Sequence, residues 1–253
     1  MLKSGRISKF ICLAVFGLAV TVGVMATSCV NKLYAPKGPV NQEAVSKIGF
    51  YETYRVGEIH DALRALDQEA AKGGGFVDSL SFGKLTRFEA IAEQTVESPA
   101  VGNVAPEDTA AVNTIITQYG PKCLPADLKL TWTAKPEIGY LPNEACRLIA
   151  LRLINGMPAM TGETIDEAKA ELEKDGSYSI FLSLNDEGAR AFSVMTSQNV
   201  NRAIAIVVDG KVYSYPIVKI RIEGGRVSIP GNFTIEEAYN IVDFIYGKDN
   251  LKL

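Results

Sequence analysis

The dipeptide Asp209-Gly210 most constrains how this 253-residue chain can fold. It separates the apolar run 203–208 from the alternating run 211–217, and a two-residue loop of this kind joins antiparallel strands. The chain is therefore not built solely from parallel strands with helical crossovers. Pro216, near the end of the second run, predicts an edge strand or a bulge, because proline donates no hydrogen bond to a neighbouring strand.

Further strands and helices are predicted on both sides of this hairpin, from apolar periodicity bounded by capping residues and glycines. Strands are predicted over 128–134, 147–154, 177–184 and 226–229. Helices are predicted from Ile59 to the glycines at 73–75, over 107–119, after the capping boxes at Thr86, Thr164 and Thr234, and after Asn185. Because hairpins and helices are mixed without strict alternation, we expect an α+β fold with mixed or antiparallel sheets packed by helices.

The N-terminus has the composition of a secretory leader. Lys3, Arg6 and Lys9 precede residues 10–30, which contain no charged side chain and end in small residues. A leader places the rest of the chain outside the cytoplasm. With the three basic residues of the leader set aside, 23 basic residues face 29 acidic ones, and the net charge moves from -3 to -6.

Three interpretations of this leader compete. The one we favour is a lipoprotein signal in which Cys29 becomes the acylated first residue; it resembles a bacterial lipobox, although Ala26 stands where that motif usually has leucine. The second is an uncleaved membrane anchor, because an apolar run of about twenty residues can span a bilayer. The third is an ordinary signal peptide cleaved after Ala26.

We expect five segments along the chain. They are a signal peptide of lipoprotein type or a membrane anchor (1–28), a tether (29–56), a helical segment that ends in a linker at 97–106 (57–106), an α+β region (107–176) and a C-terminal α+β domain (177–253). The tether is predicted from Pro36, Gly38 and Pro39.

The four cysteines divide by position. Cys12 lies in the leader and Cys29 is the candidate for lipidation, which leaves Cys123 and Cys146 for an oxidising compartment. These two form either a disulfide or two buried thiols, and the sequence leaves both interpretations open.

Composition argues against hydrolytic enzymes and against nucleic acid as a partner. His60 is the only histidine. Zinc sites with several histidines are therefore excluded, and so are catalytic sites that need one histidine in a triad and a second one as a proton shuttle. His60 also lies one step off the apolar stripe of its predicted helix, so we expect a solvated surface side chain. No basic excess exists to hold a phosphate backbone, and nucleic acid is not expected as a partner.

The motifs that suggest catalysis have simpler explanations. Three acidic pairs lie in the first turns of predicted helices, where a carboxylate stabilises the helix by about 0.3–1 kcal/mol. They are Asp166/Glu167, Asp186/Glu187 and Glu236/Glu237. Ser81 and Lys84 match the Ser-x-x-Lys pattern of penicillin-recognising enzymes, but the companion Ser-Asp-Asn and Lys-Thr-Gly elements are absent. We therefore expect no catalytic residue, no cofactor and no metal site.

Residues 180–247 carry a long ordered series of matches to a known family. The run reads Ile-Phe-Leu-Ser-Leu-Asn-Asp-Glu-Gly-Ala-Arg-Ala-Phe from 180, Ala-Ile-Ala-Ile-Val-Val-Asp-Gly-Lys-Val-Tyr-Ser-Tyr-Pro from 203 and Gly-Asn-Phe-Thr-Ile-Glu-Glu-Ala from 231. It resembles the head subdomain of the first periplasmic domain of SecD, in the SecD/SecDF protein-export translocase. Weaker similarity at 124–132 and 160–168 extends the match to about 107–247. Asn201 departs from the family, which usually has glycine there.

The resemblance implies a SecD-head-like C-terminal domain, in a family whose head is thought to contact exported polypeptide. SecD continues into transmembrane helices with charges used for proton coupling, whereas the printed sequence ends at Leu253; we expect a detached periplasmic head and not a proton-driven translocase. The expected function is that of a non-enzymatic, membrane-anchored protein of the bacterial cell envelope that binds exported polypeptide or a protein-export component. The alternative is a structural scaffold lipoprotein of an envelope or surface complex.

Overall fold

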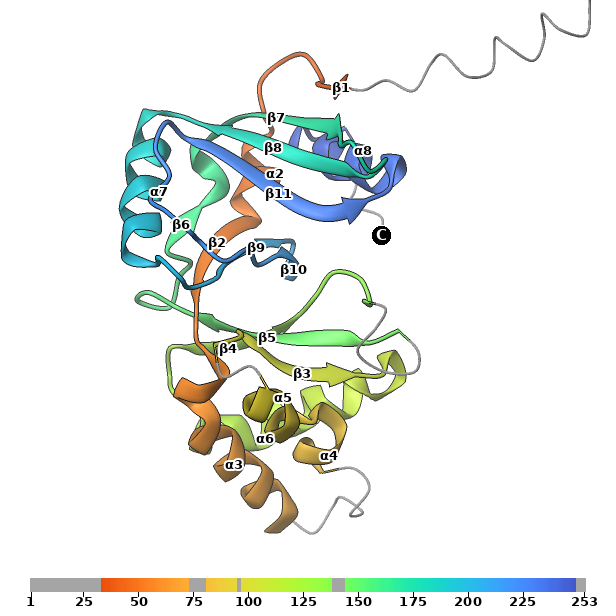
Figure 1. Cartoon of the computed structure of the whole chain (residues 1–253), viewed down its shortest axis with the longest axis vertical. Coiled ribbons are helices and arrows are strands. Elements are labelled where there is room, and N and C mark those ends of the chain that lie inside the picture. Colours follow the sequence, from red (N-terminus) through yellow and green to blue (C-terminus); the bar gives the residue numbers. More distant parts are fainter. Residues whose placement is uncertain (1–32, 73–80, 95–96, 138–143, 249–253) are drawn as a thin grey trace, which may run out of the picture.

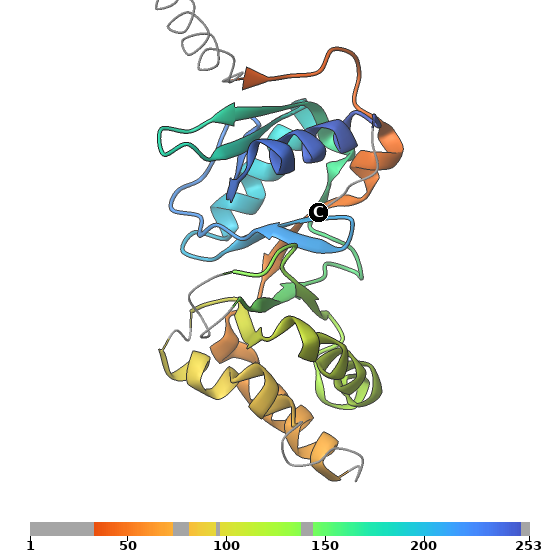
Figure 2. The same ribbon diagram turned by 90° about the vertical axis from the view of Figure 1, so that its right-hand side faces the viewer.

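The computed structural model describes residues 33–72, 81–94, 97–137 and 144–248. These residues form two lobes stacked end to end (Figures 1 and 2). The leader at 1–28 and the lipidation candidate Cys29 lie outside the described residues. None of the helices in the described ranges combines the length and the apolar composition that a membrane span needs.

The upper lobe contains a four-stranded antiparallel sheet. Its strands, in spatial order, are β1 (Leu33–Tyr34), β7 (Ile165–Leu172), β8 (Tyr178–Leu184) and β11 (Arg226–Phe233). The helix α8 (Ile235–Ile245) packs against β7, β8 and β11, and α7 (Asp186–Gln198) contacts β8. Apolar side chains of these helices and of the inner sheet face form the upper core, together with residues from 40–50 and from 204–208.

A seven-stranded sheet connects the two lobes. Its main path runs β10 (Lys211–Ser214), β9 (Ile204–Val208), β2 (Ile48–Thr53), β5 (Cys146–Arg152) and β3 (Ala100–Val104). Two further strands are β4 (Leu128–Trp132), which pairs with β5, and β6 (Met160–Thr161), which pairs with β2. Because β2 pairs with β9 along its length and with β5 at its end, it belongs to both lobes.

Helices cover the lower lobe (Figure 1). They are α3 (Val56–Lys72), α4 (Phe82–Thr86), α5 (Phe88–Gln94) and α6 (Thr109–Cys123). The long helix α3 contacts the other three, and α4 and α5 lie against β3. The lower core takes its buried residues from between Tyr54 and Ala150 and includes Trp132.

The α+β fold predicted from the sequence is confirmed. The hairpin at Asp209-Gly210 joins β9 to β10, and both turn residues have positive φ, 47° and 78°, as a tight two-residue loop requires. The strand β10 is an edge strand and has a register shift between Val212 and Ser214, just before Pro216. The five-residue helix α2 (Gln42–Ser46) was not predicted from the sequence.

The prediction of a tether over 29–56 is wrong for residues 33–56, the part of this range that the structure describes. Residues 42–46 form the short helix α2, and residues 48–53 form β2, whose first four residues are all buried. The prolines and glycine that suggested a tether end at Pro39. The apolar run that follows them forms a strand because β9 and β5 hydrogen-bond to it from distant parts of the chain.

Two further segments differ from prediction. Residues 165–172 follow a capping-box pattern at Thr164 that predicts a helix, but they form β7, because β1 and β8 pair with them on both sides and this pairing outweighs their helix propensity. The predicted linker at 97–106 contains β3, which pairs with β5.

The lobes also interleave along the sequence: the upper core uses residues from 40–50 and 160–245, and the lower core uses residues from 54–150.

Candidate functional site

An apolar groove, here called the β11 groove, lies between β9, β11 and the segment 216–222. Its volume is about 410 Å³. Its lining is mostly apolar and includes Phe192, Ile204, Ile206, Val218, Ile222 and Val227. Most of these side chains belong to the upper core, whereas Ile217 and Ile220 in the same lining are 51% and 73% exposed. Apolar side chains of another molecule could therefore be buried in this groove.

The segment 216–222 is fixed in place by hydrogen bonds to α7. Arg221 Nε donates to Ser193 Oγ at 2.7 Å, and the Ile222 N–H donates to Thr196 Oγ1 at 3.0 Å. The Asn201 N–H donates to the Val218 carbonyl at 2.8 Å, and Asn201 has a φ of 64°. This left-handed conformation favours glycine and tolerates asparagine.

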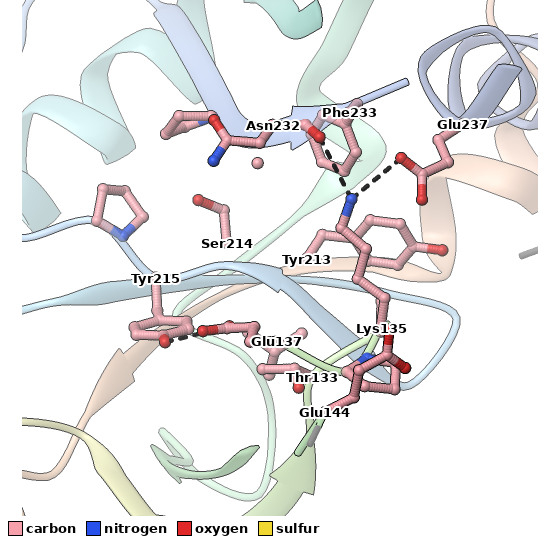
Figure 3. Close-up of a pocket in the computed structure, with 16 residues that line it drawn as sticks. Thr133, Lys135, Glu137, Glu144, Tyr213, Ser214, Tyr215, Asn232, Phe233 and Glu237 are labelled. Atoms are coloured by element: carbon pink, nitrogen blue, oxygen red, sulfur yellow. Dashed lines mark hydrogen bonds and ion pairs between the residues drawn. The ribbon is translucent and has the colours of Figure 1, made fainter. Parts of the chain in front are cut away.

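A larger cleft, of about 700 Å³, lies between the lobes near the start of α8 (Figure 3). Lys135 crosses it: its Nζ donates to Glu237 Oε2 at 3.0 Å and to the Asn232 carbonyl at 3.5 Å, and lies 5.2 Å from the centre of the Phe233 ring. Burial raises the pKa of Glu237, but hydrogen bonds from the Thr234 N–H and from Lys135 outweigh it and leave the pKa below its ordinary value.

The other wall of this cleft carries a second polar cluster. The Tyr215 hydroxyl donates to Glu137 Oε1 at 3.4 Å, and Arg147 Nη1 donates to Glu137 Oε2 at 3.4 Å and also contacts the Tyr215 hydroxyl. Burial raises the pKa of Tyr213 far above its ordinary value, so this phenol stays protonated. The charged groups of the cleft are thus largely paired with one another, and they join the lobes.

Two of the three acidic pairs lie in the first turn of a helix, as the sequence predicts. Asp186/Glu187 and Glu236/Glu237 lie in the first turns of α7 and α8. Asp166/Glu167 lie instead in β7. Ser81 is the N-cap of α4, where its Oγ accepts a hydrogen bond from the Lys84 N–H at 3.2 Å. Across the described residues, no cluster of three His, Cys, Asp or Glu side chains could hold a metal ion.

His60 is less solvated than the sequence predicts. Its Nε2 lies 2.8 Å from Glu89 Oε2, and its ring packs edge-on against Phe88 with the ring centres 5.7 Å apart. Arg64 binds the other oxygen of Glu89 at 2.7 Å. Helix α5 places Phe88 and Glu89 against α3. This contact could not be predicted from the apolar stripe of α3, because it depends on where another helix packs.

Cys123 and Cys146 are free thiols in the structure, and both are half-buried against the lower core. Burial raises the pKa of the Cys146 thiol. A disulfide between them stays a prediction, which mass analysis under non-reducing conditions tests.

Comparison with known proteins identifies relatives of the C-terminal region. Residues 148–245 match the family model described as the P1 head subdomain of SecDF. The protein translocase subunit SecD of Rhodothermus marinus is 36% identical over 154 residues, which are 60% of this chain and 24% of that protein. The protein translocase subunit SecDF of Thermus thermophilus is 37% identical over 86 residues, 34% of this chain and 12% of that protein.

A solved structure of SecDF, described as a membrane component that enhances protein export, also aligns with the chain. The alignment covers 81% of this chain and 95% of that one at 20% sequence identity, with a TM-score of 0.35. The chain spans only 24% and 12% of the lengths of the two relatives named above. The β11 groove is lined entirely from within the region that matches the head subdomain.

Proposed function

We propose that the C-terminal part of this chain is a head subdomain of the SecD type, and that the chain is a non-enzymatic cell-envelope protein that binds exported polypeptide or a component of the protein-export machinery. The observation that supports the proposal most is the β11 groove, with core side chains as its floor and exposed Ile217 and Ile220 in its lining. A polypeptide that has not yet folded carries exposed apolar side chains, and burying them here is favourable.

The proposal of a non-enzymatic role is supported by what the candidate catalytic groups do. The hydroxyl of Ser81 caps a helix, two of the acidic pairs lie at helix N-termini, and the carboxylates of Glu137 and Glu237 in the interlobe cleft contact basic side chains. Each of these groups has a role in stability.

Site-specific photo-crosslinking during active secretion tests polypeptide binding. A photo-reactive residue in place of Ile220, which is 73% exposed in the groove lining, should capture exported polypeptide. The same residue in place of Lys122, an exposed position on α6 of the lower lobe, is the control and should capture little. Equal capture at the two positions, or none at Ile220, would contradict the proposal.

The same experiment separates the proposal from the alternative of a structural scaffold. A scaffold would give crosslinks to one fixed partner, and their yield would not change when secretion is arrested. Binding of exported polypeptide requires a mixture of captured chains that disappears on arrest.

We further propose that the protein is held at a membrane, outside the cytoplasm, by a lipid on Cys29. The basic residues and the uncharged stretch before Cys29 support this attachment. Labelling cells with a radioactive fatty acid should mark the chain, and Cys29→Ser should abolish the label. Cys12→Ser is the matched control and should keep it; a label that persists in Cys29→Ser would contradict a lipid on Cys29.

A further inference from the structure

The strand β11 has one free edge. In the described part of the chain it pairs only with β8. The Leu184 N–H donates to the Gly225 carbonyl at 2.8 Å, so the residue pair just before β11 is hydrogen-bonded. Bonded and non-bonded pairs alternate along an antiparallel ladder. It follows from the register that Arg226 and Ser228 direct their backbone N–H and C=O groups away from β8, toward the free edge.

The β11 groove runs along this edge. Arg226, Ser228 and Pro230, the three alternate residues that face away from β8, all line it. Pro230 has no N–H to donate, and the register of β11 shifts between Ile229 and Phe233. The edge therefore offers the backbone groups of two residues to an added strand, and pairing ends at Pro230.

Two basic side chains stand beside the groove. Lys219 and Arg226 are part of its lining, which contains no acidic residue. Both are exposed, and neither forms an ion pair with another residue in the described ranges. The nearest carboxylate in sequence, that of Glu223, is 3.2 Å from Arg221 Nε and is thus already paired. The charge beside the groove is complementary to an acidic side chain.

We propose that the β11 groove takes up an extended polypeptide segment as an added strand, with an apolar side chain in the groove and a neighbouring acidic side chain against Lys219 and Arg226. Strand addition supplies backbone hydrogen bonds that do not depend on the sequence of the bound segment. The groove and the two basic side chains determine which segments bind best. The inference rests on the proposed function and specifies how the polypeptide binds and which segments bind best.

Peptides with a modified backbone test strand addition without altering the protein. The probe is a short fluorescent peptide with valine at alternate positions and one central glutamate, added to the full chain, with binding followed by fluorescence anisotropy. Two N-methylated forms carry the methyl groups on one or the other set of alternate residues. One form should lose about tenfold or more in affinity, because its methyl groups face β11, and the other should bind like the parent.

Variants of the protein test the edge and the charge. Ser228→Pro removes an N–H from the free edge without removing a bond to β8, and it should weaken binding of the peptide; Ser228→Ala should not. Replacing the glutamate of the peptide by lysine should weaken binding, and Lys219→Glu combined with Arg226→Glu should reverse this preference. Lys122→Glu in the lower lobe is the control for charge. Thermal melts confirm that each variant is folded.

The outcomes separate this inference from the proposed function. Binding that is unchanged in both N-methylated peptides and in folded Ser228→Pro would overturn strand addition, while capture of exported polypeptide at Ile220 would still support the proposed function. No binding of the peptide combined with no capture at Ile220 would overturn both. A dimer of the chain that Ser228→Pro dissociates, with no binding of the peptide, would assign the edge to a second copy and overturn the inference.

Discussion

Gly162 allows two segments that are far apart in the sequence to touch at the base of the upper lobe. A Cβ atom at this position would collide with the Val45 carbonyl oxygen and lie 2.7 Å from Ile48 Cβ. Both obstacles are fixed: one is backbone, and the other belongs to the buried start of β2. The glycine therefore sets how closely η3 (Gly162–Thr164) approaches α2 and β2.

Gly162→Ala should consequently destabilise the protein by about 1–3 kcal/mol, because the backbone must shift to relieve the overlap. The measurement is the free energy of unfolding from urea titrations. Gly120→Ala in α6 is the matched control: its Cβ would lie 3.3 Å from Leu124 Cδ1, the end of a flexible side chain. Alanine also favours a helix, so the control should change stability by less than about 1 kcal/mol. Equal costs at the two sites would contradict the packing argument.

Cys146 should react slowly with alkylating reagents in the reduced protein. Burial raises the pKa of its thiol, and this outweighs the opposing charge of Lys211, so little thiolate is present at neutral pH. Alkylation with iodoacetamide, followed by peptide mass analysis, should give a rate for Cys146 below that of free cysteine and still rising at pH values where free cysteine has levelled off. A rate equal to that of free cysteine throughout would contradict the prediction.

At the scale of single elements, the capping box of α8 is a local device with a measurable effect. The Glu237 N–H donates to Thr234 Oγ1 at 3.2 Å, and the Thr234 N–H donates to Glu237 Oε2 at 2.8 Å. Thr234→Ala should cost about 1 kcal/mol of folding stability. Thr114→Ala, which removes an exposed hydroxyl within α6, is the control and should cost less. Urea titration of both variants gives the comparison.

Elements with strong local signals could be predicted from the sequence. The capping residues of α7 and α8 and the Asp209-Gly210 turn act through atoms within a few residues of themselves, and all three appear where predicted. β7 and β2 could not be predicted in this way. Both strands pair with strands elsewhere in the chain. The hydrogen bonds and side-chain contacts that favour a strand over a helix or a loop are therefore not visible in the local sequence.

The β11 groove was also beyond prediction from the sequence. Its lining combines α7, β9, β11 and an irregular segment that has no periodicity of its own. The turn that follows this segment has a local cause, because Gly224 and Gly225 both have positive φ. The exposure of Ile220 depends on how Arg221 and Ile222 are bound to α7, which is a tertiary contact.

At the scale of the whole molecule, the lobes are joined by continuous sheet and by ion pairs. Arg202, just before β9, binds Glu58 of α3 through two hydrogen bonds of 2.6 and 3.0 Å. Lys135 joins the start of α8 to the region after β4. Tyr51 of β2 lies in a third buried cluster, which combines Ala100 and Ile149 of the lower lobe with Ala205 and Val207 of β9, so neither lobe keeps all its buried contacts when the other unfolds. We therefore expect the lobes to unfold together.

The Glu58–Arg202 pair makes part of this stability depend on pH. The hydrogen bond from Arg202 lowers the pKa of Glu58 below its ordinary 4.5, against the opposing effect of burial. A carboxyl group whose pKa is lower in the folded state stabilises that state at neutral pH, and the contribution is lost as the pH falls through the folded pKa. Glu58→Gln should thus cost about 0.5–1 kcal/mol at neutral pH, a value that allows for solvent screening, and almost nothing in acid.

Urea titrations of Glu58→Gln and of the parent chain, near neutral pH and below the folded pKa, measure this difference. Glu43→Gln is the matched control, because Glu43 is exposed on α2 and lies 3.8 Å from Lys47 within the same short segment. It should change stability little at either pH. If the cost of Glu58→Gln were the same in acid as at neutral pH, the ionised carboxylate would not be the group that holds α3 to the upper lobe. Coincident transitions in circular dichroism and in Trp132 fluorescence would show, in the same experiment, that the lobes unfold as one unit.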